Sequence, residues 1–178
     1  LNILTLPSSV AKIGPSAFAG FDIDTLNLSA SITSIGAGAF RNCASLTKVT
    51  LPGDNVEIAD DAFDGCPVKD LTFAFGSGAV RRSSVICKDT LETVSFPAGI
   101  TYIDSRAFSG CDKIKSITIP FTCIRIDEYA FSKCTGLEEL NLPNSMSVIE
   151  SCAFAGCSAL TSVSIPNDLT SVGTGILD

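Results

Sequence analysis

One unit of 22 or 23 residues recurs along the whole chain, and this repetition constrains the fold more than any other feature. Each unit has apolar residues at its positions 1, 4 and 6, and most units have Pro at position 7, Ala-Phe at positions 17–18 and Cys at position 21. We number as repeats one to eight the units that begin at Leu1, Ile23, Leu46, Val68, Leu91, Ile114, Leu137 and Leu160. A fixed period of this length predicts a solenoid, in which each unit packs only against its neighbours.

The spacing inside the unit predicts short strands. In the pattern Leu-x-x-Leu-x-Leu the last three residues alternate inward, outward and inward, as a strand does. Pro at position 7 ends the pairing, because it has no N–H and a fixed φ. Stacking units about 4.8 Å apart then gives a right-handed coil of parallel strands around one core. We expect these strands near residues 3–6, 25–28, 48–51, 70–73, 93–96, 116–119, 139–142 and 162–165, with shorter extended pairs at positions 10–13 and no long helix.

The unit Leu-x-x-Ile-x-Ile-Pro-x-x-Val-x-x-Ile-x-x-x-Ala-Phe-x-x-Cys resembles the BspA-like leucine-rich repeat. The resemblance covers the chain and implies a single leucine-rich-repeat solenoid domain of eight repeats over residues 1–178. It also implies a surface or secreted protein linked to adhesion to host proteins or to other cells. Repeat four departs from the pattern, because residues 74–78 replace the Pro segment and Ser84-Val85 replaces Ala-Phe. Repeat eight departs too, with Ile176-Leu177 at that place.

Composition argues against several classes of function. The chain has 12 Lys and Arg against 19 Asp and Glu, a net charge of −7, which disfavours nucleic acid or an anionic membrane as a partner. It has no His, which removes His-dependent catalysis and His-ligated metals. No apolar run approaches the roughly 20 residues of a membrane span. We therefore expect no enzyme, no cofactor and no direct membrane insertion, and leave the oligomeric state open.

Neither end carries the polar cap that a solenoid needs for solubility. Repeat one begins at its first core position with Leu1, and repeat eight stops after Asp178. We expect a fragment of a longer chain, with any signal peptide or anchor lying outside it.

The eight cysteines raise the question of a disulfide or metal ladder. Five of them share position 21, namely Cys43, Cys66, Cys111, Cys134 and Cys157. Neighbours in such a column are about 4.8 Å apart with parallel Cβ vectors, whereas a disulfide needs converging Cβ atoms about 3.5–4.5 Å apart. Cys-x-x-Cys is absent, so we expect buried thiols and no metal. Cys87, Cys123 and Cys152 are expected off the column, and Cys152, in a turn, is the thiol predicted to react first.

Two clusters of charged residues are candidate binding sites. Five acids fall within eleven residues, at Asp54, Glu57, Asp60, Asp61 and Asp64. They lack the spacing of a calcium loop, so we expect a solvated turn. Arg81-Arg82 in repeat four could hold an anion, although we favour a loop with two solvated charges.

The outward strand residues form the candidate binding surface. Positions 3 and 5 of the units are rich in Ser and Thr, with few charges and no aromatic residue. Such a face either recognises a protein or glycan or only suits an exposed sheet. We place the site on repeats five to seven, whose regularity predicts the flattest continuous platform. Its residues are Thr93, Ser95, Ser116, Thr118, Glu139 and Asn141, with Arg81 and Arg82 as a rim. The predicted function is non-enzymatic extracellular binding or adhesion; the alternative is a stalk that displays another domain.

Overall fold

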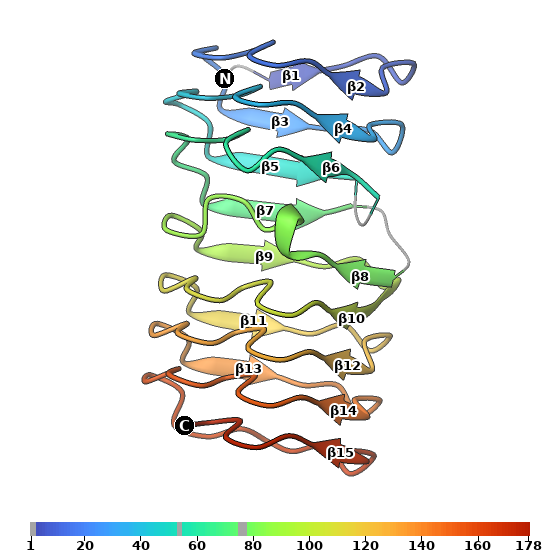
Figure 1. Ribbon diagram of the computed structural model, residues 1–178, viewed down its shortest axis with the longest axis vertical. Helices are drawn as coiled ribbons and strands as arrows, with labels where there is room; N and C mark the ends of the chain where they lie inside the picture. Colours follow the sequence, from blue (N-terminus) through green and yellow to red (C-terminus); the bar gives the residue numbers. More distant parts are fainter. Residues whose placement is uncertain (1–2, 53–54, 75–77) are drawn as a thin grey trace.

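The protein is a tall stack of chain turns, with its two ends at opposite ends of the stack (Figure 1). The computed structural model describes residues 3–52, 55–74 and 78–178. Helix is almost absent from these residues, since the single helical element is the three-residue 3₁₀ turn η1 (Arg82–Ser84). None of the described segments is a helix long and apolar enough to cross a bilayer. The predicted solenoid of parallel strands is confirmed.

In each of the first seven turns one strand lies on what we call the strand face. These strands are β1 (Ile3–Thr5), β3 (Thr25–Asn27), β5 (Lys48–Leu51), β7 (Asp70–Phe73), β9 (Thr93–Ser95), β11 (Ser116–Thr118) and β13 (Glu139–Asn141). They pair in parallel one unit apart, so that Leu26 lies beside Val49 and Ile117 beside Leu140. These four residues are buried while their neighbour Thr118 is exposed, which confirms the inward and outward assignment.

The predicted strand over residues 162–165 is wrong, because these residues belong to no strand. Ile165 is 49% exposed, whereas Ile119 at the same unit position is 3% exposed. The last turn is covered by a neighbour on one side only. Ile165 therefore buries less apolar surface than Ile119 does, although the first turn, which also has one neighbour, keeps the strand β1.

A second extended segment follows in every turn, as predicted. These strands are β2 (Lys12–Ile13), β4 (Ser34–Ile35), β6 (Glu57–Ile58), β8 (Gly78–Val80), β10 (Ile100–Ile103), β12 (Arg125–Ile126), β14 (Val148–Ile149) and β15 (Ser171–Val172). They form a three-stranded sheet, β2-β4-β6, and a five-stranded sheet, β8-β10-β12-β14-β15. The sheet is thus interrupted between β6 and β8, where irregular repeat four begins to depart from the pattern.

Stacked Phe rings fill the core behind the turns. The ring of Phe131 lies 5.0 Å from Phe108 and 5.6 Å from Phe154, which confirms its predicted place between them. A second column joins Phe40 to Phe63 at 5.1 Å. Repeat four has Val85 at this unit position, so the two columns do not meet.

The turn face, made by positions 14–21 of each unit, is held by backbone hydrogen bonds between repeats. The amide of Phe131, for example, donates to the carbonyl of Ala153 at 2.8 Å. The chain reverses through left-handed backbone at two unit positions, such as Tyr129 (φ 56°) and Lys133 (φ 59°). The same turn therefore recurs with Gly or with a larger residue, such as Ser16 or Asn42, in the left-handed places.

A column of thiols runs beside the Phe rings. The Sγ of Cys66 donates to the carbonyl oxygen of Phe40 at 3.0 Å. The same contact is made by Cys43, Cys134 and Cys157. Cys87 makes it too, with Phe63 at 3.7 Å, so the prediction that Cys87 lies off the column was wrong. Cys87 stands one position before the Cys of the regular repeats, and its left-handed backbone (φ 50°) is also found at that position in Asn42 and Lys133.

The strand face is not one continuous platform. Its strands form a five-stranded sheet, β1-β3-β5-β7-β9, and a separate pair, β11-β13. The flat platform expected over repeats five to seven is therefore interrupted between repeats five and six. Repeat five has Phe96 at the position where repeat six has Ile119, and the Phe96 ring lies 5.8 Å from the Phe108 ring. On its other side Phe96 stacks on Phe73 of repeat four at 6.0 Å, where β7 and β9 remain paired.

Candidate functional site

A cleft of about 900 Å³ opens on the strand face where the sheet is interrupted. We call it the strand-face cleft. It lies between β9 and β11 and is lined by Glu92, Thr93, Val94, Ser95, Phe96, Asp112, Lys113, Lys115, Ser116, Thr118 and Pro120. The break in the sheet, which leaves facing strand edges unpaired with each other, is what creates this cleft.

The structure brings together four of the six residues proposed from the sequence. Thr93 and Ser95 on β9 and Ser116 and Thr118 on β11 all line the cleft. The other two, Glu139 and Asn141, lie outside the cleft on the next strand, where they are exposed and register with Ser116 and Thr118. Arg81 and Arg82 line a different pocket and do not line this cleft.

Charged residues at the cleft were missed from the sequence. Lys69 pairs with Glu92 at 2.9 Å, and Lys115 pairs with Glu138 at 3.0 Å. These four residues occupy position 2 of successive repeats, so they form a ladder of alternating charge. The ladder has no ion pair from Glu92 to Lys115, which both line the cleft. The alternation of charge at position 2 can be read from the sequence, whereas the missing ion pair between Glu92 and Lys115 cannot.

Apolar residues at the cleft were also missed. Phe96 is half-buried in the cleft wall, and Pro120 lines the cleft beside Phe121, whose side chain is 71% exposed. The substitution of Phe for Leu or Ile at position 6 was the available signal for Phe96. The cleft thus combines hydroxyls, both signs of charge and aromatic surface, which is the composition of a recognition site.

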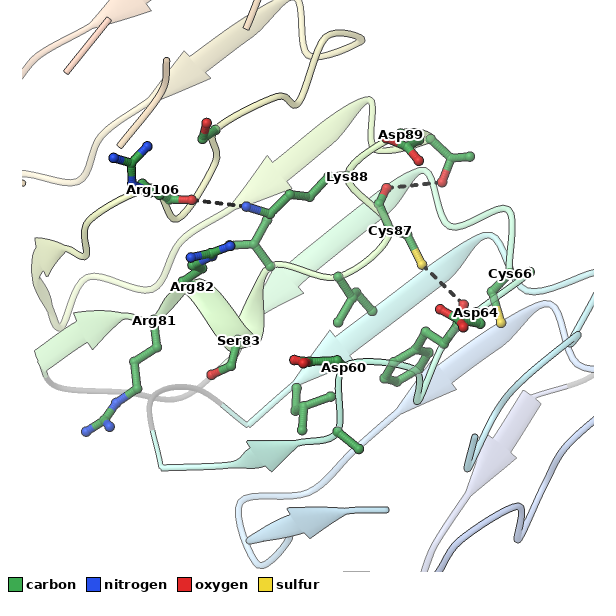
Figure 2. Close-up of a pocket in the computed structure, with 18 of the residues that line it drawn as sticks. Asp60, Asp64, Cys66, Arg81, Arg82, Ser83, Cys87, Lys88, Asp89 and Arg106 are labelled. Carbon is green, nitrogen blue, oxygen red and sulfur yellow. Dashed lines mark hydrogen bonds between the residues drawn. The ribbon is translucent and has the colours of Figure 1, made fainter. Parts of the chain in front are cut away.

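A second pocket, of about 1200 Å³, lies on the turn face around repeat four, and we call it the repeat-four pocket (Figure 2). Arg81, Arg82 and Lys88 line it from repeat four, and Asp60 and Asp64 line it from repeat three. It lies where the Phe columns are interrupted, because Val85 leaves the space that a Phe ring fills in regular repeats.

Lys88 is the most enclosed cation of the repeat-four pocket. Its Nζ donates to the carbonyl oxygen of Arg106 at 3.0 Å. Burial lowers the pKa of Lys88, and the nearby positive charge of Arg82 acts in the same direction. Two cations therefore share one side of this pocket.

The clustered acids of repeat three are partly placed by the structure. Asp54 lies outside the described residues. Asp61 pairs with Arg41 and accepts a hydrogen bond from the amide of Gly38 at 3.1 Å. The described residues contain no group of three or more Cys, Asp or Glu arranged to hold a metal ion.

Most of the thiols are buried in the core and are unreactive there. All eight cysteines are unpaired thiols in the structure. Burial raises the pKa of Cys66 and Cys123 to about 11 and that of Cys87 and Cys111 to about 12. Such groups stay protonated at neutral pH and make poor nucleophiles. Cys87 and Cys152 are half-buried, whereas the other six cysteines are buried.

A family model for the BspA-type leucine rich repeat region, with six copies, matches residues 1–84 and 81–178. The chain belongs to the BspA-type leucine-rich repeat family. For this BspA-type chain the match covers both the regular repeats and irregular repeat four. No curated protein matches the sequence.

Solved structures agree with this family. A leucine-rich repeat protein from Bacteroides ovatus is 25% identical with a TM-score of 0.60, and the match covers 99% of this chain and 54% of that one. A leucine rich cell surface protein from Faecalibacterium prausnitzii is 29% identical with a TM-score of 0.54, over 99% and 44% of the two chains. A T. pallidum leucine-rich repeat protein shares the fold at 22% identity, with a TM-score of 0.57 over 96% and 72% of the chains. The BspA-type chain thus spans about half the length of the first two.

Proposed function

We propose that this BspA-type chain is a non-enzymatic binding or adhesion module that recognises a protein or glycan through the strand-face cleft. The observation that carries the proposal is the interruption of the sheet between β9 and β11. It produces a cleft lined by Thr93, Ser95, Ser116 and Thr118, on the face that solenoids commonly use for binding.

The chemistry of the cleft suits a protein partner best. Hydroxyls give directional contacts of about 0.5–1.5 kcal/mol each, which fix orientation more than affinity. Phe96 in the wall and the exposed Phe121 beside Pro120 supply the apolar contact area that dominates most interfaces. Lys113 forms no ion pair within the described chain, so it is free to meet an acidic group of the partner.

We place this module at the cell surface or outside the cell, as part of a longer chain. A relative at 29% identity is a leucine rich cell surface protein, and the present chain covers 44% of its length. The affinity of one module should be modest, because most cleft contacts are individually weak. Many copies or many repeats acting together would supply useful adhesion.

The test introduces charge on the cleft side of the strand face without touching the core. The variant combines Ser95→Lys, Thr118→Lys and Asn141→Lys, all at exposed outward positions. Binding to cells and to immobilised matrix proteins and glycans is measured in a pull-down. We expect at least about a tenfold loss of binding with an unchanged melting temperature, because like charges and lost hydroxyl contacts oppose the docked partner.

A matched control carries the same three changes at the other end of the same face, as Thr5→Lys, Asn27→Lys and Thr50→Lys on β1, β3 and β5. It should bind as the unmodified protein does. Equal binding by both variants would remove the cleft as the site. A folded protein that captures no partner on any surface would instead favour the stalk.

A further inference from the structure

The turn face around repeat four has hydrogen-bonding groups without partners. In repeats one, two, five, six and seven, the amide at position 18 donates to the next repeat, as Phe40 does to Ala62 at 2.8 Å. The amides of Phe63 and Gly65, at positions 18 and 20 of repeat three, have no acceptor among the described residues. Both residues line the repeat-four pocket. The pocket therefore presents two backbone donors that regular stacking would have satisfied.

Cations line the same pocket without ion-pair partners. Arg81, Arg82, Lys88 and Arg106 all line it, and none forms an ion pair within the described chain. The guanidinium of Arg106 lies over the ring of Tyr129 at 4.3 Å, and Lys88 uses one of its three donors on the carbonyl of Arg106. The side chain of Arg82 has no polar partner among the described residues. Arg82 and Lys88 are thus the pair best placed to meet an anionic group.

The carboxylates of Asp60, Asp64, Asp89 and Asp104 also line the pocket. In the view of Figure 2, Asp64 and Asp89 lie on the side opposite Arg82 and Arg106. The hydroxyls of Ser83, Thr90 and Ser109 also line the pocket. Carboxylates repel a ligand that carries several negative charges, but they accept hydrogen bonds from ligand hydroxyls. The residues that line the pocket therefore favour a ligand with one anionic group and several hydroxyls.

We propose that the repeat-four pocket binds a sugar acid, with its single carboxylate against Arg82 and Lys88 and its hydroxyls toward Asp60, Asp64 and Asp89. The amides of Phe63 and Gly65 donate to ring or hydroxyl oxygens of the sugar. A volume of about 1200 Å³ admits one or two sugar rings. This site lies on the turn face, so it is separate from the strand-face cleft and does not depend on it.

The experiment titrates the protein with glucuronate and follows backbone amide signals by NMR. We expect saturable shifts at Phe63 and Gly65. Glucose and acetate should each bind at least about tenfold more weakly than glucuronate, because each lacks one half of the recognised chemistry. Equal binding of acetate would show a plain carboxylate site, and equal binding of glucose would show that the cations contribute nothing; either result overturns the proposal.

Three variants test the residues. Arg82→Gln, at an exposed side chain, should weaken glucuronate binding at least about tenfold, and Lys88→Gln should do the same. Lys12→Gln removes an exposed cation on β2 and should leave binding unchanged. Unchanged binding in both pocket variants, or shifts that spare Phe63 and Gly65, would overturn the assignment. The strand-face triple variant should still bind glucuronate, which keeps this outcome distinct from that of the cleft.

Discussion

The Sγ of Cys87 lies 3.7 Å from the carbonyl oxygen of Phe63, so repeat four keeps a contact of the regular repeats although its sequence has lost their Ala-Phe-x-x-Cys spacing. The backbone at Cys87 is left-handed, as it is at the same unit position in regular repeats, for example at Asn42 and Lys133. Cys87 thus continues the thiol column at the place where the Phe column is interrupted. Repeat four therefore keeps the thiol contact of the regular repeats but lacks their Phe ring, because Val85 stands at that position.

Removing a ring from the Phe column should cost much more than removing a hydroxyl from the strand face. Phe131 is 1% exposed between two stacked rings, so Phe131→Ala should lower the free energy of unfolding by about 3–5 kcal/mol. Thr118→Ala, at an exposed outward position, should change it by less than about 0.5 kcal/mol. A denaturant titration of both variants measures the difference, and equal costs would contradict the inward and outward assignment.

Replacing the buried hydroxyl of Ser84 should stabilise the protein. Ser84 is 1% exposed, and its Oγ has no hydrogen-bond partner within the part of the chain that the structure describes. Ser84→Ala restores the Ala found at position 17 of most repeats and should raise the free energy of unfolding by about 1 kcal/mol. Ser132→Ala is the control, because that buried hydroxyl is bonded to Ser109 Oγ at 2.8 Å and should give no gain. A loss of stability in Ser84→Ala would mean that the hydroxyl is satisfied in solution.

The cysteines should titrate as eight free thiols once the protein is unfolded. Under denaturing, non-reducing conditions a thiol assay should count close to eight groups. In the native state one or two should react quickly, with Cys152 first, because it is half-buried and burial raises the pKa of Cys87, the other half-buried thiol, to about 12. A Cys152→Ser variant should lose the fast phase and keep the slow one. A denatured count near zero would show that the column is oxidised.

Buried thiols should make the fold less stable at alkaline pH. Burial raises the pKa of Cys111 from its ordinary 9.0 to about 12. A raised pKa in the folded state gives stability that is complete below pH 9 and is lost as the pH rises toward 12, because the unfolded chain releases the proton first. Between pH 8 and pH 10 one such thiol should cost about 1 kcal/mol.

Thermal melts of the unmodified protein and Cys111→Ala across this pH range provide the check. The variant should begin with lower stability, because a small core group is lost, but its melting temperature should fall less between pH 8 and pH 10. Parallel slopes for the two proteins would count against a buried, neutral Cys111.

The repeating contacts were predictable because each depends on one unit and its copy. The inward Ile117, the outward Thr118 and the stacked Phe131 follow from positions that recur at a fixed period. A period of 22 or 23 residues brings identical positions side by side in a stack, so a local pattern becomes a column. The same reasoning failed at residues 162–165, where no strand forms although the apolar spacing of the unit is kept.

The sequence by itself determined the solenoid, its two faces and the hydroxyl-rich surface that contains Ser95 and Thr118. Only the tertiary structure decided where that solenoid is interrupted. The cleft forms where β9 and β11 separate beside Phe96. The repeat-four pocket forms where the turn beside Val85 lies between Phe63 and the next repeat. A departure from the repeat is visible in one unit, but the space it leaves is set by the units packed on both sides, because backbone bonds and side-chain volumes there must adjust together.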